Sequence, residues 1–155
     1  MINTDISKKN CQEIAKLLNH LLANEYILYT KTWKFHWNVK GKHFGALHAF
    51  LDAQRIELGN IIDDVAERVR ALDIDSIGTL KEFLEKTALP EHPGKNPDDL
   101  TMLKLLLTDH MEIIRKTRQD AEFVMKWNDS ATNSFLCELL EKHEKMAWML
   151  RAHLQ

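Results

Sequence analysis

Hydrophobic residues recur at helical spacing along almost the whole chain. Four long stretches place apolar side chains every three or four residues, which is the pattern of a helix with one buried face. We predict helices over residues 7–37, 43–72, 98–127 and 131–153, the first of them capped by Ser7. The sequence has no strand-like alternation and no internal repeat. The pattern therefore predicts an all-α protein.

The connections between these helices differ in length, and the difference predicts the topology. Short turns around Gly41 and over residues 128–130 join the first helix to the second and the third to the fourth. The connection over residues 73–97 is longer and holds all three prolines. Within it, residues 79–86 suit a short helix capped by Thr79. Two tight turns and one long crossover predict a ferritin-like four-helix bundle whose crossover connection carries a short extra helix.

Length and charge narrow the class of protein. We expect 155 residues to form one domain over residues 1–155, with a short flexible tail over residues 1–6. The formal net charge of −2 gives no general attraction to nucleic acid or anionic membranes, and we expect no membrane span. Cys11 and Cys137 lie far apart without a C-x-x-C spacing. We expect two free thiols and a cytoplasmic location, with a disulfide as the alternative.

Candidate metal ligands are concentrated in the second predicted helix and just before it. His48 and Asp52 are four residues apart, and so are Asp63 and Glu67, so each pair places two donors on one helix face. His36 lies upstream, at the end of the first predicted helix. Imidazole together with carboxylate suits ferrous iron, manganese or zinc. A solvated polar face is the alternative reading of the same residues.

The two pairs cannot serve one metal ion within one chain. Asp52 and Asp63 are eleven residues apart, which is about 16 Å along a helix, whereas ligand bonds are about 2 Å long. A second, antiparallel copy crossing near residues 57–58 would bring Asp63 of one chain beside His48 of the other, and a two-fold axis would create two identical sites. Gly59, next to this crossing, either permits close approach or is simply tolerated. No Glu is followed three residues later by a His, so Glu-x-x-His sites inside one bundle are excluded.

At three places the sequence resembles the Dps family, the DNA-binding proteins from starved cells or mini-ferritins: HWNVKGKHFGALHAFLD, DDVAERVRAL and the ending HEKMAWMLRAHL. The resemblance covers the chain from about residue 10 onward. It implies a homo-dodecameric shell built on two-fold dimers, with a ferroxidase centre shared across each dimer interface. The implied ligands are His36, His48 and Asp52 of one chain with Asp63 and Glu67 of its partner.

The resemblance also implies an enzyme. It would oxidise ferrous iron, preferably with hydrogen peroxide, and store ferric mineral in the shell, which protects against oxidative stress. Iron is the expected metal, with zinc or another divalent metal as a substitute. Trp37, directly after His36, resembles a tryptophan near the centre in relatives that intercepts stray oxidising equivalents. A packed interface aromatic is the alternative role for Trp37.

The sequence departs from the family pattern before the last helix. Many relatives carry two aspartates there that line an acidic pore, whereas this chain has NDSATNS. Asp129 is the retained candidate pore residue, with an ordinary turn aspartate as the alternative, and Ser134 stands at the second position. The pore is therefore expected to be less acidic, or to use Asp120 or Glu138 instead.

The second departure concerns DNA. DNA-binding relatives often carry a lysine-rich mobile tail, whereas Lys8 and Lys9 are the lysines near this N-terminus. The alternative function is a shell that binds and compacts nucleoid DNA, with a secondary metal site. We expect DNA binding to be weak or absent, because few phosphates could be neutralised. His110 and His143 lie on the apolar stripes and are expected to be hydrogen-bonded bundle histidines.

Overall fold

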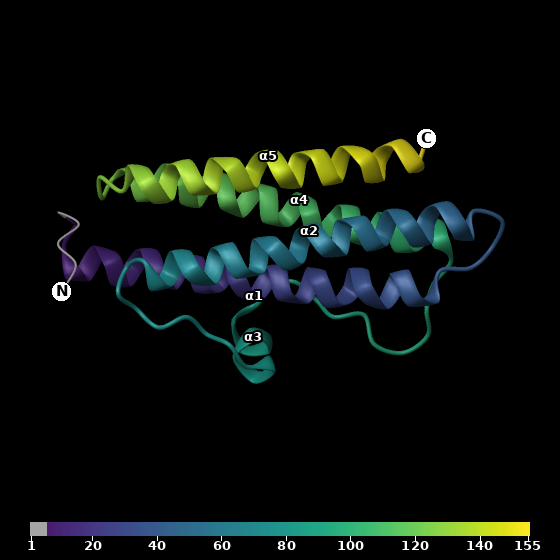
Figure 1. Cartoon of the computed structure of the whole chain (residues 1–155), viewed down its shortest axis with the longest axis horizontal. Coiled ribbons are helices and arrows are strands. Elements are labelled where there is room, and N and C mark those ends of the chain that lie inside the picture. The colour runs from purple at the N-terminus through teal and green to yellow at the C-terminus, as the bar shows by residue number, and fades with distance from the viewer. Residues whose placement is uncertain (1–5) are drawn as a thin grey trace.

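The protein is described from a computed structural model, which covers residues 6–155 (Figure 1). Within that range the chain forms five helices and no strand. The helices are α1 (Lys8–Asn38), α2 (Phe44–Arg70), α3 (Leu80–Lys86), α4 (Asp99–Met125) and α5 (Ser130–His153). The all-α prediction is confirmed, and so are the four long helices and the short fifth one. The predicted tail lies outside the described residues, apart from Ile6.

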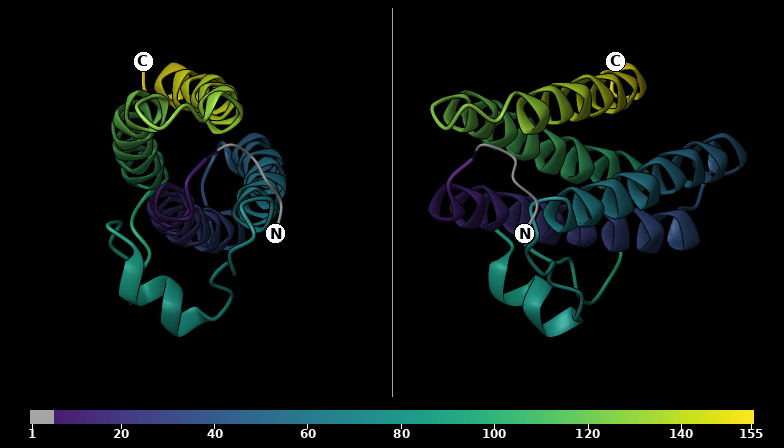
Figure 2. Two further views of the ribbon diagram at one scale, coloured as in Figure 1. Left: turned by 90° about the vertical axis from the view of Figure 1, so that its left-hand side faces the viewer. Right: turned by 60° about the vertical axis from the view of Figure 1, so that its left-hand side comes forward.

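The four long helices form a bundle of two antiparallel hairpins. Helix α1 packs against α2, α4 packs against α5, and further contacts join α1 to α4 and α2 to α5. Seen from one end, the four helices surround a common centre, and the short α3 lies outside them against α1 (Figure 2). The crossover connection runs the length of the molecule between α2 and α4 (Figure 1). This is the predicted ferritin-like topology.

Local capping explains where the helices begin. The Ser7 side chain accepts a hydrogen bond from the Asn10 backbone N–H, and Asp98 does the same for Thr101 at the start of α4. Helix α3 has a full capping box, in which Thr79 and Glu82 satisfy each other's backbone N–H groups. Gly41, in the turn before α2, has a φ of +105°, a conformation that favours glycine.

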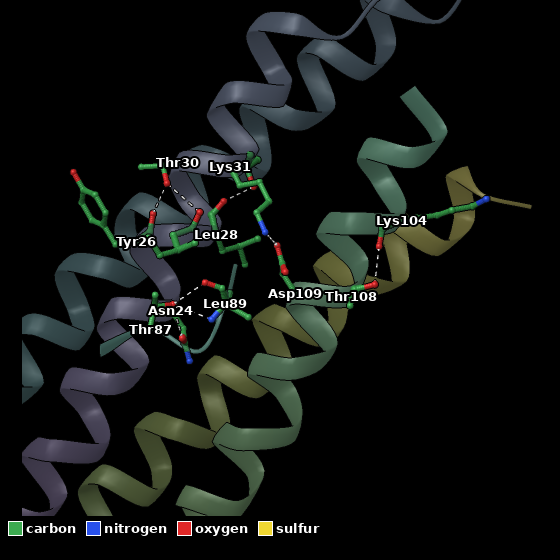
Figure 3. Close-up of polar contacts among 12 residues, drawn as sticks. Asn24, Tyr26, Leu28, Thr30, Lys31, Thr87, Leu89, Lys104, Thr108 and Asp109 are labelled. Carbon is green, nitrogen blue, oxygen red and sulfur yellow. Dashed lines mark hydrogen bonds and ion pairs between the residues drawn. The ribbon is translucent and has the colours of Figure 1, made fainter. Parts of the chain in front are cut away.

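Polar contacts fasten the crossover to α1. The Asn24 side-chain oxygen accepts hydrogen bonds from the Thr87 hydroxyl at 2.9 Å and the Ala88 backbone N–H at 2.8 Å (Figure 3). The Thr87 hydroxyl in turn accepts from the Leu89 backbone N–H at 3.0 Å. A single buried amide thereby orders the segment that follows α3, where the chain has no regular structure to satisfy its own N–H groups.

A buried ion pair ties α1 to α4. The Lys31 ammonium donates to the Asp109 carboxylate at 2.7 Å, and both side chains are about 95% removed from solvent (side-chain exposures 4% and 5%) (Figure 3). Burial raises the pKa of Asp109, and the Lys31 charge opposes that rise. Removing one partner of such a pair leaves an uncompensated buried charge, so loss of either side chain is expected to be strongly destabilising.

The cysteines and the hydropathy of the helices were also considered in the sequence. Both cysteines are free, with Cys11 buried and Cys137 exposed. Among the described residues, no helix has the length and apolar character needed to cross a membrane.

Candidate metal centre

The candidate ligands divide into two groups on the same helix. His48 and Asp52 lie in the first half of α2, and His36 lies opposite them near the end of α1. Asp63 and Glu67 lie near the other end of α2. Because α2 is one continuous helix, the separation of about 16 Å between Asp52 and Asp63 is a property of the folded chain.

The backbone of the α1–α2 hairpin holds the two histidines reciprocally. His36 Nδ1 lies 2.8 Å from the His48 carbonyl oxygen, and His48 Nδ1 lies 2.9 Å from the His36 carbonyl oxygen. The rings stack with centroids 3.8 Å apart. A carbonyl oxygen can only accept, so each Nδ1 must carry a hydrogen, and in the neutral imidazole the Nε2 then has a lone pair that can bind a metal ion. This is the arrangement in which a backbone carbonyl orients a metal-binding imidazole.

Asp52 adds a carboxylate next to these rings. The Arg55 guanidinium donates to Asp52 Oδ1 from Nε at 2.9 Å and from a terminal nitrogen at 2.8 Å. These bonds hold the pKa of Asp52 below its usual value, and the positive charge of Arg55 acts in the same direction. Asp52 is therefore an anion at neutral pH with its second oxygen, Oδ2, free to bind a cation.

Asp63 and Glu67 have a different environment. Both side chains are exposed, and neither makes a hydrogen bond or ion pair within residues 6–155. In that part of the chain, no three His, Cys, Asp or Glu side chains gather closely enough to hold a metal ion. His36 and His48 lie against each other, Asp52 lies one turn after His48 on α2, and the acidic pair lies further along the same helix. A complete five-ligand site within one chain is incompatible with this geometry.

Trp37 directly follows His36 near the end of α1. Its side chain is 61% exposed, and its ring centroid lies 4.7 Å from that of Trp33 one turn earlier. The ring of Tyr29, one turn before Trp33, has its centroid 5.4 Å from that of Trp33, and the two rings are nearly edge to face. Both roles predicted for Trp37, an interceptor of oxidising equivalents and an interface aromatic, require such an exposed ring beside the centre.

Asp129 has a structural role that the sequence did not reveal. It is the N-cap of α5, accepts from the Thr132 backbone N–H at 2.9 Å, and pairs with Arg68 at 3.2 Å. Only 2% of the residue is exposed. Its carboxylate is thus occupied within the chain, and a pore role for Asp129 stays a prediction that this geometry disfavours. Of the two substitutes, Glu138 is exposed, whereas Asp120 is buried and pairs with Lys116.

The bundle histidines lie in the core, away from this centre. His110 Nδ1 and His143 Nδ1 are 3.0 Å apart, and both rings are buried. The hydrogen bond predicted for these residues is therefore present. Glu25, which was not singled out from the sequence, lies beside His143 with none of its surface exposed.

Arg55 is the residue near the candidate centre that the sequence interpretation missed. The spacing of Asp52 and Arg55 could have predicted their contact, because an arginine three residues after an aspartate lies on the same face of a helix. Glu25 gave no comparable signal, since its partner is 118 positions away at His143.

Comparisons with known proteins agree with the fold. A family model described as a ferritin-like domain matches residues 15–155. An uncharacterized low temperature-induced protein of Nostoc sp. is 37% identical over 99% of this chain and 87% of its own length. The DNA protection during starvation protein of Listeria innocua is 33% identical over 94% of each chain. A crystal structure from Vibrio cholerae O1, described as a Dps protein of the ferritin-like diiron-carboxylate superfamily, has a TM-score of 0.93 at 28% identity and covers 97% of this chain and 94% of its own.

Proposed function

We propose that this chain, which belongs to the ferritin-like domain family and within it to the Dps proteins, is a ferroxidase whose active centre is shared between two subunits. The family-level role of these proteins is iron storage and protection. His36, His48 and Asp52 of one chain would bind iron together with Asp63 and Glu67 of the partner subunit. The ferric product would be stored inside a dodecameric shell. Ferrous iron is a substrate in this proposal, and zinc or another divalent ion would compete for the same ligands.

One observation carries the proposal. The reciprocal Nδ1–carbonyl contacts of His36 and His48 leave two imidazole Nε2 lone pairs beside an ionised carboxylate. Two lone pairs of this kind, held by backbone rather than by mobile side chains, are preorganised to bind a metal ion. A merely solvated polar face would not require both rings to be oriented by each other's backbone.

The need for a partner follows from the separation within α2. Since Asp63 and Glu67 cannot reach the histidine half of their own chain, a second chain must supply them. Large apolar side chains of α1, α2 and α3 are exposed in the single chain, as a surface awaiting a partner would require: Trp37, Phe44 and Ile56, with Leu80 and Leu84 on α3. A two-fold dimer would cover this surface and complete two sites.

The proposed reaction is oxidation of iron by hydrogen peroxide. Two ferrous ions each give one electron to the peroxide, its O–O bond breaks, and two protons are taken up to form two water molecules. Carboxylates stabilise the resulting ferric ions, and the imidazoles hold the ferrous ions before the electron transfer. Because each peroxide molecule accepts two electrons, no hydroxyl radical is released. Trp37 would intercept oxidising equivalents that escape from the centre.

The test is iron oxidation by the intact protein, together with its native mass. We expect ferrous iron to be consumed at about two ions per peroxide, in the two-metal stoichiometry, by a particle of about twelve chains. A His36→Ala, Asp63→Ala double variant should lose most of the rate while keeping its mass. Unchanged kinetics in that variant would rule out these ligands, and a monomeric wild type would rule out a shared centre.

The alternative, a shell whose main role is binding DNA, has less support from the described chain. Lys8 and Lys9 are exposed, but they form the first turn of α1 rather than a lysine-rich mobile tail. We infer a cytoplasmic location from the two free thiols.

A further inference from the structure

We infer that Arg55 is a positioning residue of the candidate centre, which holds Asp52 so that a single carboxylate oxygen faces the metal ion. The inference rests on the proposed function, because it assumes that Asp52 is a ligand. It adds a residue outside the set that the ligand spacing identifies.

The first step is the geometry of the Arg55–Asp52 contact. Arg55 uses Nε and one terminal nitrogen, at 2.9 and 2.8 Å, and both donate to the same oxygen, Oδ1. In the common forked arrangement, by contrast, the two nitrogens each bind a different oxygen. Here Oδ1 accepts both hydrogen bonds, and Oδ2 accepts none from residues 6–155. Asp52 can therefore offer Oδ2 to a metal as a single-oxygen ligand, while Arg55 prevents both oxygens from binding the same ion.

The second step is that Arg55 is itself held in place. Its guanidinium carbon lies 5.0 Å from the centre of the Trp33 ring, within cation–π range. Its remaining terminal nitrogen lies 3.5 Å from the Tyr29 hydroxyl. About four-fifths of the Arg55 side chain is covered, since 21% is exposed, whereas 39% of the Asp52 side chain is exposed. An arginine restrained on three sides can restrain the carboxylate that it binds, which a freely moving surface arginine cannot.

The third step is to weigh the cost of a positive charge so close to the centre. The Arg55 charge opposes binding of a cation, so charge alone gives no reason for an arginine at this position. Its benefit lies in the geometry of the loaded site. A carboxylate limited to one oxygen leaves a coordination position open for the oxidant, and loss of a comparable supporting residue typically costs about 10- to 100-fold in activity or affinity.

The experiment compares Arg55→Ala and Arg55→Lys with wild type in the assembled protein at saturating ferrous iron. We expect Arg55→Ala to lower the iron-oxidation rate about 10- to 100-fold with an unchanged particle mass. Arg55→Lys should remain close to Arg55→Ala, because an ammonium keeps the charge but lacks the planar fork. Visible absorption of bound Co²⁺, which depends on ligand number and geometry, should change in both variants.

Arg115→Ala is the matched control. Arg115 also donates twice to a carboxylate three residues before it, Glu112, but it lies on α4 and makes no cation–π contact within the described part of the chain. It should behave as wild type in rate and in Co²⁺ absorption. Arg55→Ala that matches Arg115→Ala in both readouts would overturn the inference, and Arg55→Lys with wild-type values would show that charge alone suffices. Those results leave the proposed function intact, whereas a wild type that oxidises no iron would overturn both.

Discussion

His143 Nε2 lies 2.8 Å from Glu25 Oε1 in the middle of the bundle, where neither side chain has more than 1% of its surface exposed. The atoms are within hydrogen-bond distance, but their alignment is poor, and the second Glu25 oxygen has no partner among the described residues. On its other side, His143 contacts His110. Helices α1, α4 and α5 thus share one buried cluster of a carboxyl and two imidazoles, which must be close to neutral in total because an isolated charge there is costly.

We expect His143→Leu to destabilise the fold by about 3 to 5 kcal/mol, because it removes the partner of a fully buried acid. Glu25→Leu combined with His143→Leu should recover most of that loss, since both polar groups are then replaced by apolar ones. The measurement is urea unfolding at one fixed protein concentration, because assembly contributes to the apparent stability. Glu144→Ala, in an exposed pair with Arg118, should stay within about 0.5 kcal/mol of wild type. A double variant no better than His143→Leu would contradict this account.

The same cluster predicts a loss of stability in mild acid. Burial, and then the neighbouring His143, hold the pKa of His110 well below its ordinary value of 6.5. The unfolded chain binds a proton at His110 below about pH 6.5 while the folded chain does not, so unfolding takes up a proton. The contribution of His110 to the free energy of unfolding is therefore complete above about pH 6.5. It declines as the pH falls, by at most about 1.4 kcal/mol per pH unit.

The check is the urea midpoint of wild type and His110→Gln from about pH 7.5 to 5.5, above the range in which most carboxyls titrate. The glutamine can still hydrogen-bond to His143 but cannot titrate, so its stability should fall less steeply with acid. Asp109, one position before His110 and paired with Lys31, has a raised pKa and acts with the opposite sign. Identical slopes in the two proteins would assign the acid sensitivity to other groups.

The sequence predicted local features better than buried polar ones. The caps Ser7 and Thr79 were predicted, because a cap depends on residues within about one turn. Asp129 also caps a helix, but its second bond, to Arg68, joins residues 61 positions apart. The Lys31–Asp109 pair spans 78 positions. A contact of that length depends on how the helices are placed in three dimensions, which the spacing of apolar residues does not specify at the level of side chains.

The candidate centre shows the same division. The i, i+4 pairs and the axial separation within α2 follow from helix geometry, and both could be derived from the sequence. The mutual orientation of His36 and His48 by their carbonyl groups could not, because it depends on the packing of α1 against α2 at the turn around Gly41.

We expect Asp129→Ala to cost about 2 kcal/mol or more, because it removes an N-cap and leaves the Arg68 guanidinium without its carboxylate. Asp129→Asn should cost less, since an asparagine can still cap α5. Asp98→Ala is the matched control, as Asp98 caps α4 in an exposed position, and it should cost about 1 kcal/mol. Thermal unfolding at fixed concentration measures all three. Slow iron uptake in an Asp129→Ala protein of wild-type stability would instead support the predicted pore role.

A sharing of the centre between subunits predicts complementation between two inactive chains. One chain carries His36→Ala and Asp52→Ala, and the other carries Asp63→Ala and Glu67→Ala. In a dimer of the two, one site combines both damaged halves, but the other combines the intact histidine half of the second chain with the intact acidic half of the first. Random assembly from equal amounts should therefore restore about a quarter of the wild-type sites, by the symmetry of a two-fold interface.

The two variants should be co-expressed so that the dimers form together, and the rate of iron oxidation should be measured per chain. Each variant purified alone is the control, and mixing the two after assembly should restore less than co-expression does. A centre contained within one chain predicts no recovery in any mixture, because each chain would then carry a damaged site of its own. Activity near a quarter of wild type after co-expression, with both pure variants inactive, is the result that only a shared centre predicts.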